Sequence, residues 1–181
     1  HPERGVTLFE GLLVTVLLGI FFGAVFEAVT VGLRAVNAAD EREAIRLELA
    51  NVLDHVTREA STARNVDRAQ DARFQFDADY DGSGGSSGSE DNVNYQYDSA
   101  TGTLTREHSG GPTVTLLNNI TAFDFDYIDD TGTTYTSCDS SGSCGSNCCR
   151  SEVRAVLVTL TATDDGETIS ATDAATLRNR P

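Results

Sequence analysis

The chain has 181 residues, enough for one domain of about 110–150 residues beside a membrane segment, and its formal net charge is −15 at pH 7. Residues 1–70 hold ten acidic and seven basic side chains, whereas residues 71–181 hold eighteen and six. This acidic balance argues against nucleic-acid binding, which requires a basic surface, and favours solvation or divalent cations.

An apolar segment near the N-terminus sets the first expectation. From Val6 to Phe26 it contains twenty-one residues and one charged side chain, Glu10. At about 1.5 Å rise per residue, a helix of this length spans the ~30 Å hydrocarbon core of a bilayer. A lone carboxylate there costs on the order of several kcal/mol and is tolerated with a partner or a function. Glu10 therefore either reaches water near the headgroups of a signal anchor or takes part in an assembly.

The residues around this carboxylate carry a family resemblance. Arg4 and Gly5, followed by Val6-Thr7-Leu8-Phe9-Glu10 and the apolar run, resemble the prepilin peptidase site and first helix of type IV pilins and type II secretion pseudopilins. The resemblance implies that the peptidase cuts after Gly5 and that Val6 becomes an N-methylated N-terminus. Glu10 then matches the glutamate at the fifth mature position.

The same resemblance supplies a partner for Glu10. An ammonium on Val6 of one copy pairs with Glu10 of a neighbour, so that the burial of two opposite charges sets the register of assembly. If residues 1–5 are retained, this amine does not exist. Thr7 or a neighbour's Arg4 then becomes the expected donor.

Helix-favouring residues continue without proline from the apolar segment through Ala63. Gly19, Gly23 and Gly32 remove side chains from the helix surface and permit close approach of other helices. Beyond Asp40 the pattern is amphipathic, with apolar residues at spacings of three and four. These apolar positions are Ile45, Leu49, Val52, Val56, Ala60 and Ala63. We expect this half to pack on a sheet, which predicts an α+β fold with a long N-terminal helix, the lollipop shape of pilins.

An acidic stretch follows the first expected strand at 73–77. Aspartates at alternate positions ahead of a glycine are typical of the opening of EF-hand-like calcium loops. The expected ligands are Asp77, Asp79, Asp81 and Ser83, with Glu90 or Asp91 in place of the bidentate glutamate, since Gly88 occupies the twelfth position. The alternative is a flexible, solvated acidic loop, which the Gly and Ser content also suits. We expect no organic cofactor.

The remaining sequence is typical of antiparallel β-structure. Strands are expected where β-branched and aromatic residues gather, at 93–97, 102–106, 113–117, 121–128, 153–163 and 168–172. In the strand 121–128, Phe123, Phe125 and Tyr127 alternate with two aspartates, which predicts one buried and one acidic face. Residues 73–130, with the acidic loop between their strands, resemble the ectodomains of W-type minor pilins and J-type pseudopilins.

Four cysteines lie in a Ser/Gly/Thr-rich insertion between residues 129 and 151. They are Cys138, Cys144, Cys148 and Cys149. The spacing lacks the paired Cys-x-x-Cys of common zinc sites, and an exported chain meets oxidants, so we expect two disulfides rather than a metal. A Cys148–Cys149 bond is the least favoured because it strains the backbone. Whether Cys138 pairs with Cys148 or Cys149 stays open.

These patterns lead us to expect a function other than catalysis. No nucleophile and base, phosphate-binding glycine loop or metal-catalytic motif is evident, so we predict that the chain is not an enzyme. We expect a leader or N-terminal extension (1–5), a membrane and filament-core helix (6–35), and an ectodomain (36–181) with an acidic loop at 77–91.

The leading hypothesis is a structural subunit of a type IV pilus or pseudopilus-like filament. Its expected partners are other copies or other pilins, the prepilin peptidase, and the inner membrane before assembly. It would then lie in an extracellular filament or a periplasmic pseudopilus. The alternative is a monomeric, membrane-anchored module that recognises calcium or a surface partner.

Overall fold

The computed structural model describes residues 8–78, 92–108, 111–139, 148–164 and 166–177. It contains one long helix, α1 (Leu8–Ala60), and eleven strands among these residues. The chain divides into two compact units, residues 1–44 and 45–181, and we call the second unit the domain.

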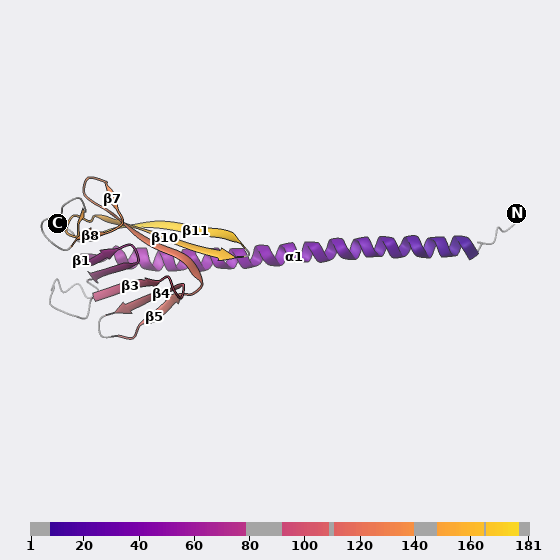
Figure 1. Cartoon of the computed structure of the whole chain (residues 1–181), viewed down its shortest axis with the longest axis horizontal. Helices are drawn as coiled ribbons and strands as arrows, with labels where there is room; N and C mark the ends of the chain where they lie inside the picture. Colours follow the sequence, from indigo (N-terminus) through magenta and orange to yellow (C-terminus); the bar gives the residue numbers. More distant parts are fainter. Residues whose placement is uncertain (1–7, 79–91, 109–110, 140–147, 165, 178–181) are drawn as a thin grey trace. The chain divides into compact units, whose positions relative to one another are not determined.

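Helix α1 runs without interruption from the apolar segment into the domain (Figure 1). It ends at Ala60, where the Thr62 hydroxyl donates to the Glu59 carbonyl and the Ser61 amide to the Thr57 carbonyl. These bonds satisfy carbonyls that a helix C-terminus leaves without partners. Ala63, expected in the helix, is instead the first residue of strand β1.

The strands form two sheets. The first has seven strands in the order β5-β4-β3-β2-β1-β8-β9, and all its neighbours are antiparallel except β8 and β9. Its strands are β1 (Ala63–Gln70), β2 (Arg73–Ala78), β3 (Asn92–Asp98), β4 (Thr103–His108), β5 (Val114–Leu117), β8 (Cys138–Asp139) and β9 (Cys148–Cys149). Figure 1 shows β3, β4 and β5 side by side.

The second sheet has four antiparallel strands in the order β11-β10-β6-β7. They are β6 (Ile120–Ile128), β7 (Thr134–Tyr135), β10 (Ala155–Asp164) and β11 (Glu167–Thr176). The turn after β10 contains Gly166 at φ 80°, which joins β10 and β11 into a hairpin with ten paired positions. The α+β class expected from sequence is therefore confirmed, with two sheets in place of one.

The core joins both sheets to the last turns of α1. Leu49, Leu53 and Val56 of the helix are buried in the same cluster as the apolar faces of the strands. Phe74 of β2 lies between the sheets, with its ring centroid 5.3 Å from that of Phe125 on β6. The Phe125 amide also donates to the Asp71 carbonyl at 2.9 Å, so that backbone and aromatic contacts fix the two sheets together.

Strand β1 was missed because its buried residues do not alternate. Its burial follows a period of three, with Ala63, Val66 and Ala69 inside, because the pairing with β2 shifts register twice. A period of three lacks the alternation that indicates a strand, so no element was expected at residues 64–70 and Ala63 was placed in the helix.

Candidate functional site: an exposed apolar helix

The N-terminal part of α1 presents an unusually large exposed apolar surface. Its most apolar 18-residue window has a mean hydropathy of 2.4, and none of that window is buried. Large side chains are exposed all round the helix, including Phe9 at 73%, Ile20 at 66% and Phe26 at 75%. Within the described residues, α1 is the one helix long and apolar enough to span a membrane. It can therefore anchor the chain in a lipid bilayer.

The polar groups of this segment suit an apolar environment. The Thr15 hydroxyl donates to the Leu12 carbonyl and the Thr30 hydroxyl to the Phe26 carbonyl, both at 2.8 Å. Each hydroxyl thus finds its acceptor within its own helix, which lowers the cost of its removal from water. Glu10 differs from these threonines because its side chain is an ionisable carboxyl group, which costs more free energy to remove from water than a hydroxyl does.

Glu10 lies in the first turn of α1 with its side chain exposed. A carboxylate is favoured there by the positive end of the helix dipole. The predicted processing residues Gly5 and Val6 lie outside the described residues. The proposed pairing between Val6 and Glu10 therefore stays a prediction.

Glycines interrupt the apolar surface of this helix. A Cβ added at Gly19, Gly23 or Gly32 would meet nothing within 4 Å. Gly19 and Gly23 are four residues apart and therefore lie on the same face of the helix, the spacing of small residues at close helix–helix contacts. This spacing, which the sequence analysis did not single out, gives the helix a flat strip on which another helix can pack.

The C-terminal end of α1 is held to the first sheet by a buried ion pair. Glu59 is 8% exposed, and its carboxylate accepts from Nε of Arg106 on β4 at 2.8 Å and from Nη2 of the same residue at 2.5 Å. The hydroxyl of Tyr95 on β3 donates to the same carboxylate. Burial, followed by the charge of Glu59, raises the pKa of the Tyr95 phenol well above its usual value. The phenol therefore remains a donor to Glu59.

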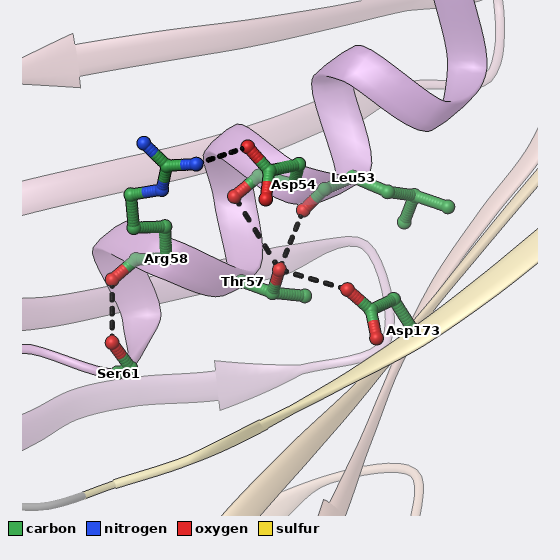
Figure 2. Close-up of polar contacts among 6 residues, drawn as sticks. All are labelled: Leu53, Asp54, Thr57, Arg58, Ser61 and Asp173. Atoms are coloured by element: carbon green, nitrogen blue, oxygen red, sulfur yellow. Dashed lines mark hydrogen bonds and ion pairs between the residues drawn. The ribbon is translucent and has the colours of Figure 1, made fainter. Parts of the chain in front are cut away.

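A second contact holds the same helix to the other sheet. Figure 2 shows the Thr57 hydroxyl between the Leu53 carbonyl, at 2.8 Å, and Oδ2 of Asp173 on β11, at 3.0 Å. Beside it, Arg58 forms an exposed ion pair with Asp54 at 2.7 Å. The C-terminal end of α1 is thus bonded to both sheets.

Of the predicted cation ligands, the structure describes one. Asp77 is the penultimate residue of β2, whereas Asp79, Asp81, Ser83, Glu90 and Asp91 lie outside the described residues. The amide of Asn92 on β3 donates to Oδ1 of Asp77 at 3.1 Å and to Oδ2 of Asp67 on β1 at 2.9 Å. Burial and the nearby Asp77 raise the pKa of Asp67. Within the described part of the chain, no three His, Cys, Asp or Glu side chains converge on one point.

Asp67 and Asn92 were missed by sequence reasoning. They join Asp77 because β1 and β3 flank β2, an order that the linear pattern did not contain, since no strand was expected between Ala63 and Arg73. Asp67 and Asp77 therefore form a carboxylate pair beside Ala78, the last residue of β2.

The cysteine insertion is fixed by a disulfide between Cys138 and Cys148. This bond joins β8 to β9, while Ala69 of β1 pairs with Cys138 and attaches them to the first sheet. Cys149 is also disulfide-bonded. The fourth cysteine, Cys144, lies outside the described residues.

No protein-family model matches the chain, and no curated protein is significantly similar to it. We therefore infer a function from the residues described above.

Proposed function

We propose that this protein is a structural, non-catalytic subunit of a type IV pilus or pseudopilus-like filament. It is held in the inner membrane before assembly and displays its β-domain outside afterwards. The observation that supports this most is the exposed apolar surface of the N-terminal part of α1, a helix whose C-terminal end is bonded to both sheets. Such a surface must be covered by lipid or by other apolar helices.

Assembly explains the carboxylate and the glycines better than a simple anchor does. A membrane anchor gains nothing from Glu10, because a more apolar residue would insert at least as well. In a bundle of copies, the carboxylate can pair with an ammonium on a neighbouring chain, and the strip at Gly19 and Gly23 lets the helices approach closely. Misregistered copies would leave a buried charge without its partner.

The test compares two carboxylates on the same helix. Glu10→Ala should leave membrane insertion intact but reduce filament number, because each added copy brings an unpaired ammonium into the core. The penalty is about 3–5 kcal/mol, more than a hundredfold per addition. Glu27→Ala removes the same charge further along α1 and should assemble normally. Normal filament numbers for Glu10→Ala would overturn this mechanism.

Processing at the N-terminus is tested separately. We propose cleavage after Gly5 by a prepilin peptidase, with N-methylation of Val6. Mass spectrometry of the mature N-terminal peptide should then begin at a methylated Val6, and Gly5→Leu should block the cleavage. If the mature chain retains residues 1–5, Val6 has no free ammonium group, and the proposed pairing of Val6 with Glu10 would be wrong.

A second candidate function has its own observation. The carboxylates of Asp67 and Asp77 share the Asn92 amide at the base of the stretch 79–91, where the sequence predicts a calcium loop. The chain would then be a membrane-anchored monomer that binds calcium or a surface partner.

Calcium binding would raise the melting temperature of the full chain, since the ion binds the folded state and offsets repulsion between carboxylates. Asp79→Asn with Asp81→Asn should abolish that rise. Equal melting in chelator and in excess calcium would eliminate this candidate, as would filaments built by the wild-type chain.

A further inference from the structure

One exposed turn of the domain carries an acceptor pattern for sugar attachment. Asn119-Ile120-Thr121 has the form Asn-x-Ser/Thr with no proline between, and no other asparagine of the chain has Ser or Thr two positions on. Asn119 lies between β5 and β6 with φ 60°, and its side chain is exposed. The positive φ marks a tight turn that directs this asparagine away from the sheet.

We propose that Asn119 is an N-glycosylation site, modified on the outer side of the membrane. The donor is an oligosaccharide linked to a polyprenyl pyrophosphate, and the enzyme is a membrane-bound oligosaccharyltransferase. The Asn119 amide nitrogen forms a bond to C1 of the first sugar while the C1–oxygen bond to the pyrophosphate breaks. The amide loses one proton, and the lipid pyrophosphate leaves with the electron pair. No oxidant or reductant is required.

The surface beside Asn119 has room for the attached sugar. A cavity of about 340 Å³ lies against this turn, and Asn119 is one of its lining residues. Its lining combines apolar side chains, among them Ile45, Leu49 and Leu117, with polar ones that include Glu48. Sugars present both apolar C–H faces and hydroxyls, so the first saccharide can contact both kinds of lining residue.

The folded contacts also determine when the transfer occurs. Ile120 is 4% exposed, and the Thr121 hydroxyl donates to the Thr161 carbonyl of β10 at 3.2 Å. A transferase that binds the Thr121 hydroxyl and its neighbour Ile120 competes with this bond and with the burial of Ile120. Transfer is therefore favoured before β6 pairs with β10, as the chain emerges from the membrane.

The test uses the chain purified from membranes of its own cells. Trypsin cleaves after Arg106 and Arg150, which places Asn119 in one peptide, 107–150. Its mass should exceed that of the bare peptide by a saccharide, and fragmentation should place the saccharide on Asn119. Thr121→Ala should lower occupancy at least tenfold, whereas Thr121→Ser and Asn118→Gln should keep it.

A bare Asn119 in the wild-type protein would overturn the proposal. So would a saccharide that survives Thr121→Ala, or one that maps to a Ser or Thr hydroxyl. Because Thr121→Ser preserves the acceptor pattern and the hydroxyl, its retained occupancy separates loss of the pattern from loss of folding. The proposal requires export of the domain and not filament formation, so the peptide masses remain decisive even if no filaments form.

Discussion

The attachment of α1 to the domain should depend strongly on Arg106. Arg106→Ala removes two hydrogen bonds, of 2.8 and 2.5 Å, from a carboxylate that is 8% exposed. Breaking a buried ion pair on one side costs about 3–5 kcal/mol, and because the Arg106 side chain is itself 21% exposed we expect the lower end, about 3 kcal/mol.

Arg58→Ala is the matched control. It removes another arginine–carboxylate pair of α1, with a comparable distance of 2.7 Å, but the two side chains are 77% and 66% exposed. Exposed pairs at this helical spacing contribute about 0.3–0.5 kcal/mol. The two variants therefore test burial rather than the number of ion pairs.

The assay is urea unfolding of the full chain in detergent. The tyrosine signal in near-ultraviolet circular dichroism monitors the transition. All five tyrosines follow residue 79 in the sequence, so the signal comes from the domain and not from the apolar segment. When Glu59 is already replaced by Gln, Arg106→Ala should lower the free energy of unfolding by less than it does in the wild-type chain. The difference is the interaction energy between the two charged side chains. Equal losses for Arg106→Ala and Arg58→Ala would refute the reasoning.

Three further predictions concern the domain. Gly102→Ala should lower the free energy of unfolding by about 2–3 kcal/mol in the same assay, because φ is 63° and the new Cβ would lie 2.8 Å from the Ile120 carbonyl oxygen. Gly132→Ala should lower it by about 1 kcal/mol, because φ is 83° but the new Cβ would meet nothing within 4 Å. Stability should fall above about pH 10, because the raised pKa of Tyr95 keeps its proton in the folded state while the unfolded chain releases it, and Tyr95→Phe should make the fall shallower in unfolding curves recorded between pH 9 and 11. Unreduced peptide mapping should recover Cys138 linked to Cys148, and replacing both by Ser should lower the free energy of unfolding by about 2–3 kcal/mol.

Much of the fold could be predicted from local patterns. The apolar segment indicates a helix, and the structure confirms it. The stripe at Leu49 and Val56 and the alternation around Phe125 each indicate an element and its buried face, and both faces are buried as expected. Local signals failed where pairing determines the outcome. The register shifts in β1 removed the alternation that indicates a strand, so this strand was not expected and the contact between Asp67 and Asp77 was missed.

The candidate site shows the same division. Glu10 and the glycines are visible in sequence because a charge or a missing side chain stands out in an apolar run. The anchoring contacts are not visible, because Glu59 meets Arg106 only when β4 takes its place in the sheet. The partner of Cys138 likewise depended on the pairing of β8 with β9.

The central claim is that copies of α1 cover one another's apolar surface. Electron cryo-microscopy of filaments sheared from the cells that make this protein tests it most directly. The account predicts a filament core in which segments 8–33 of adjacent copies pack together, with Glu10 buried against a neighbouring chain and Gly19 and Gly23 at helix contacts. A chain that stays monomeric, with this segment surrounded by lipid, would contradict it.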